Sequence, residues 1–146
     1  MIRKIRKEDK LLYLDMAKSF YSSEAVHHNI PENHLVNTFN ELMRSDDYVV
    51  GYILEHKNNI SGYALVAKTF SQEAGGMVLW IEELYVMPQY RCNGLGHEFF
   101  SYLKNSMANT IKRIRLEVED GNDKAIALYQ EIGFKDLPYS QMIKEL

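Results

Sequence analysis

Apolar residues in this chain follow the spacing of amphipathic helices in several separate stretches. The first stretch carries Leu12, Met16 and Phe20, which recur at about one residue per helical turn and therefore share a face. Gly133 follows the last stretch, where a glycine can leave a helix in the left-handed conformation. We predict helices over about residues 8–21, from Pro31 to about Arg44, over residues 95–108 and over residues 122–132.

Runs rich in β-branched and aromatic residues lie outside the predicted helices. Residues 48–55 and 60–70 are separated by a short polar loop, which predicts an antiparallel hairpin. Residues 112–119 alternate polar and apolar, as expected for a strand with one covered face. The complete set of strand candidates is residues 2–6, 48–55, 60–70, 77–86, 112–119, 134–137 and 139–144. This mixture of elements predicts an α+β fold.

The length and composition of the chain indicate an ordinary globular protein. A chain of 146 residues can bury a core without disulfides or metal, so we expect one domain over residues 1–146. The formal net charge of −3 gives no positive surplus for neutralising phosphates, so we expect no nucleic-acid partner. No apolar run approaches membrane-spanning length, and the N-terminus lacks the apolar core of a signal peptide. We therefore expect no membrane partner and a cytoplasmic location.

Residues 80–103 follow the order strand, loop, helix, with Gly94 and Gly96 where the helix begins. Such a junction presents unpaired backbone N–H groups at the positive end of a helix, which suits a phosphate. A dinucleotide fingerprint would need a third glycine where Phe99 stands, and a P-loop would need a Gly-Lys-Ser/Thr sequence, which is absent. The alternative is a tight turn whose glycines serve packing only.

Two segments resemble the sequence motifs of one family. The loop Arg91-Cys-Asn-Gly94-Leu-Gly96 is similar to the R/Q-x-x-G-x-G/A signature of the GNAT superfamily of N-acetyltransferases. Residues 122–134 fit the N-x-x-A-x-x-L-Y-x-x-x-G-F segment of the same family. The resemblance implies a GNAT fold: a mixed, mostly antiparallel sheet of about six or seven strands with about four flanking helices, splayed between strands 77–86 and 112–119.

The same resemblance implies acetyl-CoA as the co-substrate. In family members the backbone of the glycine loop holds the CoA pyrophosphate, and the pantetheine arm lies in the gap between the splayed strands. The backbone N–H of Val86 would then face the thioester carbonyl and stabilise the developing oxyanion. The resemblance places the cofactor contacts at Tyr85, Val86, Arg91, Cys92, Asn93, Gly94, Leu95, Gly96 and Asn122. Asn122 is equally suited to capping the start of a helix.

A general base is needed because an amine acceptor is mostly protonated at neutral pH. Glu82 and Glu83 are the candidates. Successive strand residues point to opposite faces, so only one of them should face the acceptor unless a bulge intervenes. The run of residues 82–87 resembles the Glu-Asp-aromatic-aromatic-Val-Met segment of diamine acetyltransferases, whose first acid is the proposed base. We therefore favour Glu82, although it could also be an ordinary solvated acid.

A general acid is expected at Tyr129. By the motif resemblance, its phenol protonates the CoA thiolate as it leaves. The alternative is a core tyrosine, because Tyr129 lies on the apolar helix stripe with Leu128 and Ile132. Cys92 is not expected to be a nucleophile, since it belongs to the phosphate loop. The adjacent His27 and His28 lack a third ligand at metal spacing, so we expect no metal site.

The leading hypothesis is direct transfer of an acetyl group from acetyl-CoA to a primary amine in a ternary complex. A small cationic amine is the expected acceptor, because several acids are expected to border the acceptor side: Glu24, Glu82, Glu83, Glu119 and Asp120. The alternatives are a protein N-terminus or lysine as acceptor, or a CoA-binding sensor without catalysis. A homodimer is a further expectation, because many family members form dimers through their terminal strands. We expect the loop of residues 21–33 to set acceptor specificity, but this loop contains no recognisable motif.

Overall fold

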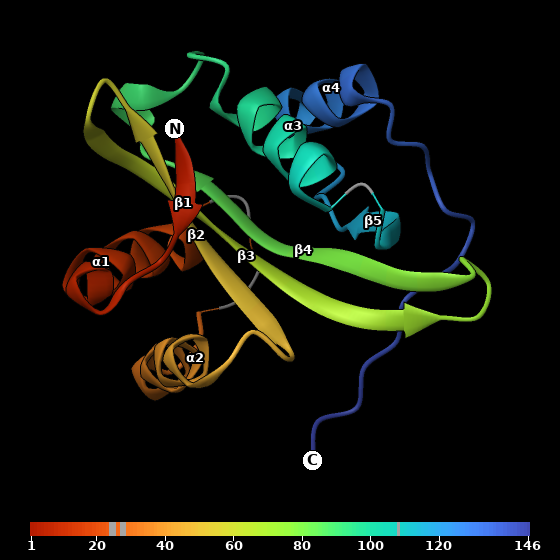
Figure 1. Cartoon of the computed structure of the whole chain (residues 1–146), viewed down its shortest axis with the longest axis horizontal. Coiled ribbons are helices and arrows are strands. Elements are labelled where there is room, and N and C mark those ends of the chain that lie inside the picture. The colour runs from red at the N-terminus through yellow and green to blue at the C-terminus, as the bar shows by residue number, and fades with distance from the viewer. Residues whose placement is uncertain (24–25, 27–28, 108) are drawn as a thin grey trace.

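The computed structural model describes residues 1–146 except 24–25, 27–28 and 108, and it contains a β-sheet with helices on both faces (Figure 1). Glu24, His27 and His28 lie outside the described residues. The strands are β1 (Ile2–Lys4), β2 (Val49–His56), β3 (Asn59–Ser71), β4 (Gly76–Val86) and β5 (Ile111–Leu116). The α-helices are α1 (Lys10–Tyr21), α2 (Glu32–Arg44), α3 (Leu95–Met107) and α4 (Asp123–Ile132), and short 3₁₀ turns cover Lys7–Asp9 and Pro88–Tyr90.

The sheet has the strand order β1-β2-β3-β4-β5, so each strand lies beside its neighbours in sequence. The first three pairings are antiparallel, whereas β4 and β5 run parallel because α3 carries the chain back between them. Pairing of β4 with β5 extends only as far as Ile81 and Leu116, while β4 continues to Val86. The predicted splay between these two strands is therefore confirmed, and it opens along residues 82–86.

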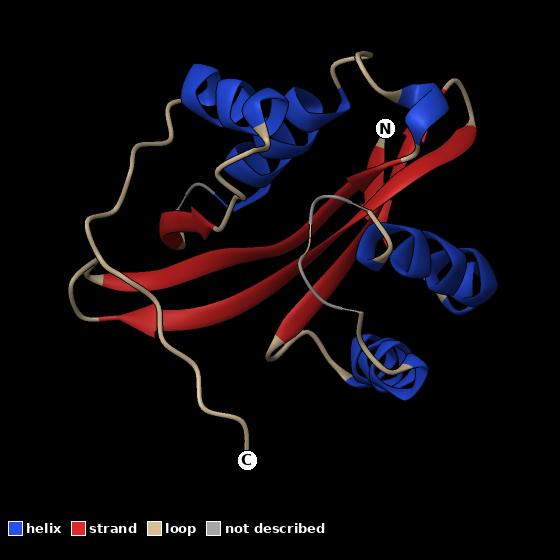
Figure 2. Cartoon of the chain, turned by 180° about the vertical axis from the view of Figure 1, so that it is seen from behind, coloured by secondary structure: helices blue, strands red, loops and turns tan. Residues whose placement is uncertain are grey.

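Two hydrophobic clusters hold the layers together, one on each face of the sheet. α1 and α2 cover one face, where Tyr13, Phe39 and Tyr63 are among the most buried side chains. α3 and α4 lie on the opposite side, where α3 buries Phe99 and Leu103 against strand residues. Figures 1 and 2 show this separation from opposite directions. Near the splay, one face of the sheet is therefore on the side of α1 and α2, and the other face is on the side of α3 and α4.

The helix predictions agree with the structure to within about two residues at each end, as expected where apolar periodicity is strong. Gly133 ends α4 with φ of 105°, and its N–H donates to the carbonyls of Tyr129 and Gln130, as predicted for a left-handed cap. The α+β class and the GNAT architecture are confirmed.

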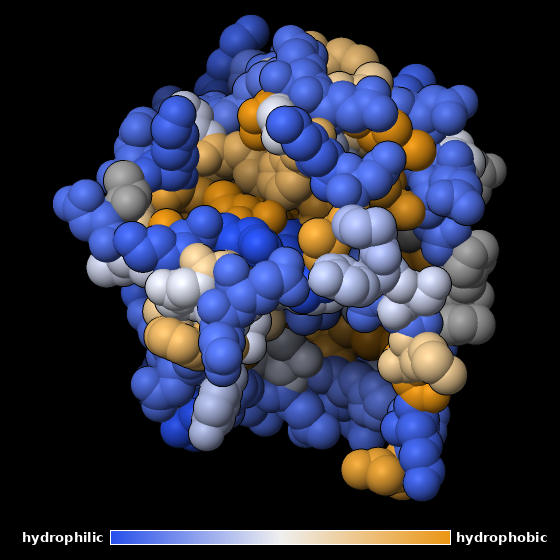
Figure 3. All heavy atoms as spheres, turned by 90° about the vertical axis from the view of Figure 1, so that its right-hand side faces the viewer, coloured by the Kyte–Doolittle hydropathy of each residue, from blue (hydrophilic) through white to orange (hydrophobic). Residues whose placement is uncertain are grey.

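The predicted strand count is wrong. Residues 134–137 and 139–144 form no strand, and β5 ends at Leu116 instead of residue 119. Alternating residue types make a strand only when a neighbouring backbone accepts its hydrogen bonds, and Pro138 has no N–H to donate. Large apolar side chains of this segment are exposed, among them Tyr139, Met142 and Ile143. Figure 3 views the molecule from the side of α4 and the β3–β4 turn, and shows apolar atoms in hollows among hydrophilic side chains.

Candidate active site

The loop before α3 has the backbone geometry of an anion-binding concavity. Cys92 and Gly94 both adopt left-handed conformations, with φ of 62° and 75°. Left-handed residues within such a loop turn successive N–H groups toward a common centre. The first N–H groups of α3, from Leu95 to His97, have no intrahelical acceptor, because the first such bond runs from Glu98 N–H to Gly94 C=O at 3.0 Å. The loop therefore fits a phosphate without any side-chain contribution.

The two glycines of this loop serve different purposes. A Cβ placed on Gly94 would meet no atom within 4 Å, so Gly94 is needed for its positive φ and for open space above the loop. A Cβ on Gly96 would lie 2.7 Å from Cδ2 of Leu128, so Gly96 is needed where α3 packs against α4. The packing interpretation therefore applies to Gly96, while phosphate binding at Gly94 stays a prediction.

Side chains of the loop mainly hold its shape. Asn93 donates from Nδ2 to the carbonyls of Tyr90 and Arg91, at 3.0 and 3.2 Å. The Arg91 side chain is exposed and donates from Nε to the Val86 carbonyl at 3.1 Å, which links the loop to the end of β4. Leu95 is buried and anchors the first turn of α3 in the core. Because only Nε of Arg91 is used in this hydrogen bond, the rest of the exposed guanidinium of this loop residue is available to a ligand.

The end of β4 directs backbone groups into the gap that β5 leaves. Met87 N–H donates to Ser61 C=O on β3 at 2.9 Å. Because backbone groups of adjacent residues in a strand point to opposite edges, the N–H of Val86 points away from β3, toward the gap. Tyr85 instead pairs with Tyr63, and its side chain is buried against Phe20 and Tyr63. A cofactor contact through the Tyr85 side chain is therefore not supported by its position.

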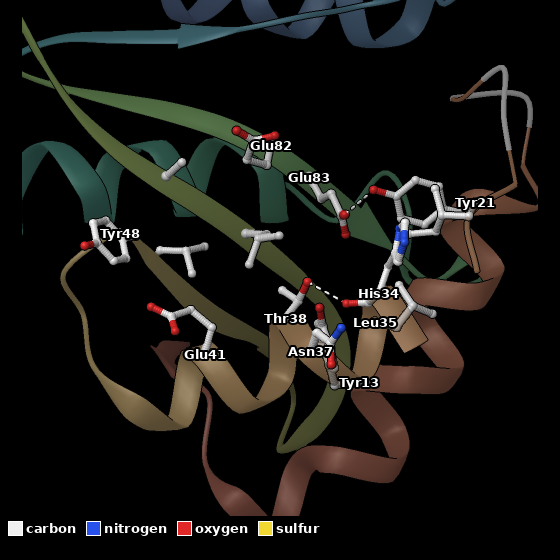
Figure 4. A pocket seen from close by; sticks show the side chains of 14 residues that line it. Tyr13, Tyr21, His34, Leu35, Asn37, Thr38, Glu41, Tyr48, Glu82 and Glu83 are labelled. Atoms are coloured by element: carbon white, nitrogen blue, oxygen red, sulfur yellow. Dashed lines mark hydrogen bonds between the residues drawn. The ribbon is translucent and has the colours of Figure 1, made fainter. Parts of the chain in front are cut away.

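A β-bulge places both candidate acids on the same side of the sheet. Leu65 of β3 pairs with Glu83, and the next residue, Val66, pairs with Ile81, so Glu82 is an extra residue in β4. Strict alternation would have sent Glu82 and Glu83 to opposite faces. With the bulge, both acids line one groove (Figure 4). Strand alternation allows both acids to face the acceptor only if a bulge intervenes, and the structure contains that bulge.

The groove has a volume of about 610 Å³ and lies between the sheet and the helices α1 and α2. Figure 4 shows the two acids of β4 on one side and side chains of α2 on the other. Its described lining consists of Tyr13, Tyr21, Ile30, His34, Leu35, Asn37, Thr38, Glu41, Tyr48, Val49, Leu65, Ala67, Glu82 and Glu83. None of these is Lys or Arg. The predicted contributors Glu119 and Asp120 are not among them.

Glu83 is a buried carboxylate held by two phenols. Tyr21 donates to its Oε1 at 2.6 Å, and Tyr63 donates to its Oε2 at 2.5 Å (Figure 4 shows the Tyr21 bond). Desolvation raises the pKa of Glu83, and the two phenol hydrogen bonds oppose that rise by favouring the charged form. Tyr21 and Tyr63 were missed in the sequence, because they are distant from Glu83 along the chain and belong to no motif.

Glu82 is exposed at the bulge, and its carboxylate makes no hydrogen bond to the described part of the chain. Desolvation by the groove walls, followed by the negative charges of Glu83 and Glu117, raises the pKa of Glu82. Because the residue is exposed, the desolvation is incomplete, and the neighbouring charges act together with it. Glu82 therefore combines an accessible carboxylate with a raised proton affinity, which are the properties of a general base.

The two sequence candidates on α4 have clear local roles. Tyr129 packs edge-on against Phe100 and Phe134, with ring centroids 5.9 and 5.7 Å apart, and desolvation raises the pKa of its phenol. The phenol is therefore protonated at neutral pH, so its proton is available for donation. Asn122 caps α4 by accepting a hydrogen bond from Ala125 N–H at 3.3 Å. The structural interpretation of Asn122 is therefore confirmed, while its contact with a cofactor stays a prediction.

The model of the acetyltransferase (GNAT) family matches residues 11–134 of this chain. The chain belongs to the acetyltransferase (GNAT) family. The match includes the glycine loop, both acids of β4 and Tyr129, so the whole candidate site lies within it.

Curated relatives and solved structures agree with this assignment. A thialysine N-epsilon-acetyltransferase from Mus musculus is 36% identical over 83 residues, which are 56% of this chain and 48% of that protein. The chain spans about half the length of the curated relatives it matches. The structure of a possible acetyltransferase from Clostridium difficile 630 has a TM-score of 0.83 at 21% identity, covering 100% of this chain and 97% of the other. A structure described as a predicted acetyltransferase with acetyl-CoA, from Clostridium acetobutylicum, has a TM-score of 0.79 at 23% identity, covering 99% and 95%.

Among the residues that the structure of this GNAT protein describes, no group of three or more His, Cys, Asp or Glu side chains is arranged to hold a metal ion. None of the described helices is both long and apolar enough to cross a membrane. Cys92 is a free, exposed cysteine in the glycine loop.

Proposed function

We propose that this protein is an acetyl-CoA-dependent N-acetyltransferase that acts on a small primary amine by direct attack in a ternary complex. One observation carries the proposal: β4 leaves β5 after Ile81, and the bulge at Glu82 begins at the same point. The gap that would take the acyl donor and the acidic groove that would take the amine therefore meet on one strand.

The cofactor side would be formed by backbone groups. Acetyl-CoA supplies an activated acetyl thioester when bound. The loop from Arg91 to Gly96 would hold its pyrophosphate through N–H groups, with the Arg91 guanidinium adding positive charge. The N–H of Val86 would stabilise the negative charge that develops on the thioester oxygen. This arrangement would allow a protein with net charge −3 to bind a polyanion at one local site.

The acceptor side would be formed by the groove. Glu82 would remove the proton from the entering ammonium, because its carboxylate is accessible and its pKa is raised. Glu83 is less suited to this task, since both of its oxygens accept hydrogen bonds from phenols. Tyr129 would return a proton to the CoA thiolate, because its phenol stays protonated.

The charge of the groove supports a cationic acceptor. Its described lining includes Glu41, Glu82 and Glu83 but neither Lys nor Arg, and Glu41 is paired with Arg44 at 2.7 Å. Aromatic walls from Tyr13, Tyr21 and Tyr48 provide faces on which an alkylammonium can lie. The matched relatives are named for acetylation of thialysine, which makes a small amine the first acceptor to test.

The test is to incubate the protein with acetyl-CoA and a panel of thialysine, 1,4-diaminobutane and short peptides. Release of free CoA thiol and the acetylated product, detected by mass spectrometry, are measured together. We expect both to appear with an amine of the panel. Acetylation of peptides alone would replace the small amine by a protein acceptor. Tight CoA binding without turnover would indicate a sensor, and absence of CoA binding would refute the proposal.

A further inference from the structure

The proposed function leaves open what holds the amine while Glu82 takes its proton. Tyr21, the last residue of α1, lines the groove and is only partly buried. Its hydroxyl lies 2.6 Å from Oε1 of Glu83, and Figure 4 shows this bond at one end of the groove. Tyr21 is therefore the phenol that links the buried carboxylate to the groove.

The direction of this hydrogen bond decides what Tyr21 can recognise. A phenol has one hydrogen to donate and oxygen lone pairs to accept with. Glu83 accepts the Tyr21 hydrogen, and burial together with the Glu83 charge raises the pKa of Tyr21, so the hydrogen stays on the phenol oxygen. Toward the groove, the Tyr21 oxygen can then act only as an acceptor. An ammonium group has only donors, so the two are complementary.

Glu83 is fixed in this role by its second partner. Tyr63 donates to Oε2 at 2.5 Å and is 1% exposed, so this side of the carboxylate is closed. The ring of Tyr63 packs edge-on against the ring of Tyr13, with centroids 5.3 Å apart, and this contact holds the Tyr63 side chain in place. Tyr63 itself is not among the residues that line the groove. The carboxylate is thus oriented by Tyr63 and presented to the groove through Tyr21.

We propose that Tyr21 is an acceptor-binding residue, whose hydroxyl oxygen accepts a hydrogen bond from the amine while Glu83 fixes its hydrogen. No proton is transferred through Tyr21 in this role, and Glu82 remains the base. The proposal rests on the proposed function, since it concerns the acceptor of that same reaction. In this proposal Glu82 receives the proton of the amine, and Glu83 orients the hydroxyl of Tyr21.

Tyr21→Phe and Tyr63→Phe form a matched pair, because each removes one phenol hydrogen bond from the same carboxylate. Only Tyr21→Phe removes an oxygen from the groove. Both are assayed with whichever of 1,4-diaminobutane, thialysine or a short peptide the wild-type protein acetylates. We expect Tyr21→Phe to raise the KM for the acceptor about tenfold, with the KM for acetyl-CoA changed less than about twofold. Tyr63→Phe should raise the acceptor KM by only about twofold, because Glu83 keeps its hydrogen bond from Tyr21 and the groove keeps its oxygen.

Equal changes in acceptor KM for both variants would overturn the proposal, because they would assign Tyr21 only to holding Glu83. An unchanged acceptor KM in Tyr21→Phe would overturn it as well. If Tyr63→Phe fails to fold by circular dichroism, Tyr21→Phe is compared with the wild type alone, and a KM raised by the same factor for the acceptor and for acetyl-CoA would contradict the assignment. An inactive wild type refutes the proposed function itself, whereas an active wild type with an unaltered Tyr21→Phe refutes only this inference.

Discussion

Glu82 and Glu83 are adjacent in sequence but have different surroundings. Glu83 is 6% exposed and accepts hydrogen bonds from two phenols, whereas Glu82 is exposed and its pKa is raised in part by the charges of Glu83 and Glu117. The two phenol hydrogen bonds favour the charged form of Glu83, so they oppose its taking a proton. The acid with fewer partners is therefore the better base, and the bulge makes it available without moving its neighbour.

Glu82→Gln should lower kcat by about 100-fold or more, the usual contribution of a general base, with little change in acetyl-CoA affinity. Because the pKa of Glu82 is raised above its ordinary value of 4.5, the base form is gained only as the pH rises through that raised value. The rate of the wild type should therefore fall on the acidic side at a pH above 4.5. The pH profile of kcat/KM measures this directly.

Glu117→Gln is the matched control for that profile. It removes one of the like charges that raise the Glu82 pKa, so the acidic limb should move to lower pH while the maximal rate is retained. The same acceptor is used for the wild type and the variant, so that ionisation of the acceptor affects both pH profiles equally. A profile of Glu117→Gln identical to that of the wild type would contradict Glu82 as the titrating base.

Sequence patterns identified the acids but not their arrangement. Glu82 and Glu83 could be named from their strand and from the family resemblance. The bulge could not be predicted, because it depends on the register between β3 and β4. Tyr21 and Tyr63 lie 62 and 20 residues from Glu83. The packing of α1 on the sheet brings Tyr21 to Glu83, and the pairing of β3 with β4 brings Tyr63 there. The signal that was available for Tyr21 is its place at the end of an amphipathic helix, next to a loop without periodicity.

The contact between α3 and α4 connects the two sequence motifs of the family. Gly96 belongs to the first motif and Leu128 to the second, and a Cβ on Gly96 would lie 2.7 Å from Leu128 Cδ2. The Asn122 cap and the Gly133 terminus fix the length of α4, so Leu128 has a defined position on that helix. These motif residues therefore serve the packing of two helices as well as any ligand.

Gly96→Ala tests this contact through its coupling to Leu128. Alanine favours a helix over glycine by about 1 kcal/mol, but in the wild type this gain should be cancelled as the new methyl displaces Leu128. In a Leu128→Ala background the methyl has room, so Gly96→Ala should raise the free energy of unfolding by up to about 1 kcal/mol. Chemical denaturation of the four proteins measures the coupling. Equal effects in both backgrounds would show that the two helices do not meet at Gly96.

Elements with a strong repeating pattern were predicted well, and the exceptions have physical causes. Helix stripes such as Leu35, Phe39 and Leu42 are buried as expected, because a helix makes its own hydrogen bonds and needs only one covered face. A strand depends on a neighbour, so its existence cannot be decided from its own residues. This is why β2 and β3 were found as a hairpin, while residues 139–144 were wrongly assigned to the sheet.

At the scale of the whole molecule, the two proposed substrate sites meet on one strand. The glycine loop at the start of α3 belongs to the side of the sheet that α3 and α4 cover, whereas the acidic groove lies on the side of α1 and α2. β4 is the strand common to both, and its last residues have no β5 partner. A donor and an acceptor can therefore approach from different directions, which is the requirement for direct transfer in a ternary complex.

Residues 138–146 lie outside this arrangement, and every one of them is exposed. Their described backbone contact is local, from Tyr139 N–H to Leu137 C=O at 2.8 Å. Deleting residues 138–146 should therefore change the melting temperature by less than about 2 °C, because little buried surface is lost. A loss of more than about 5 °C in a calorimetric scan would show that this segment does join the sheet.

The central claim is that the acetyl group passes directly from acetyl-CoA to an amine held beside Glu82. The most direct measurement uses acetyl-CoA labelled in the acetyl group, together with the amine that the protein turns over. We expect label to enter the amine only when both substrates are present, and none to remain on the protein when the amine is omitted. Label bound covalently to the protein, or released as free acetate without acetylated amine, would contradict it.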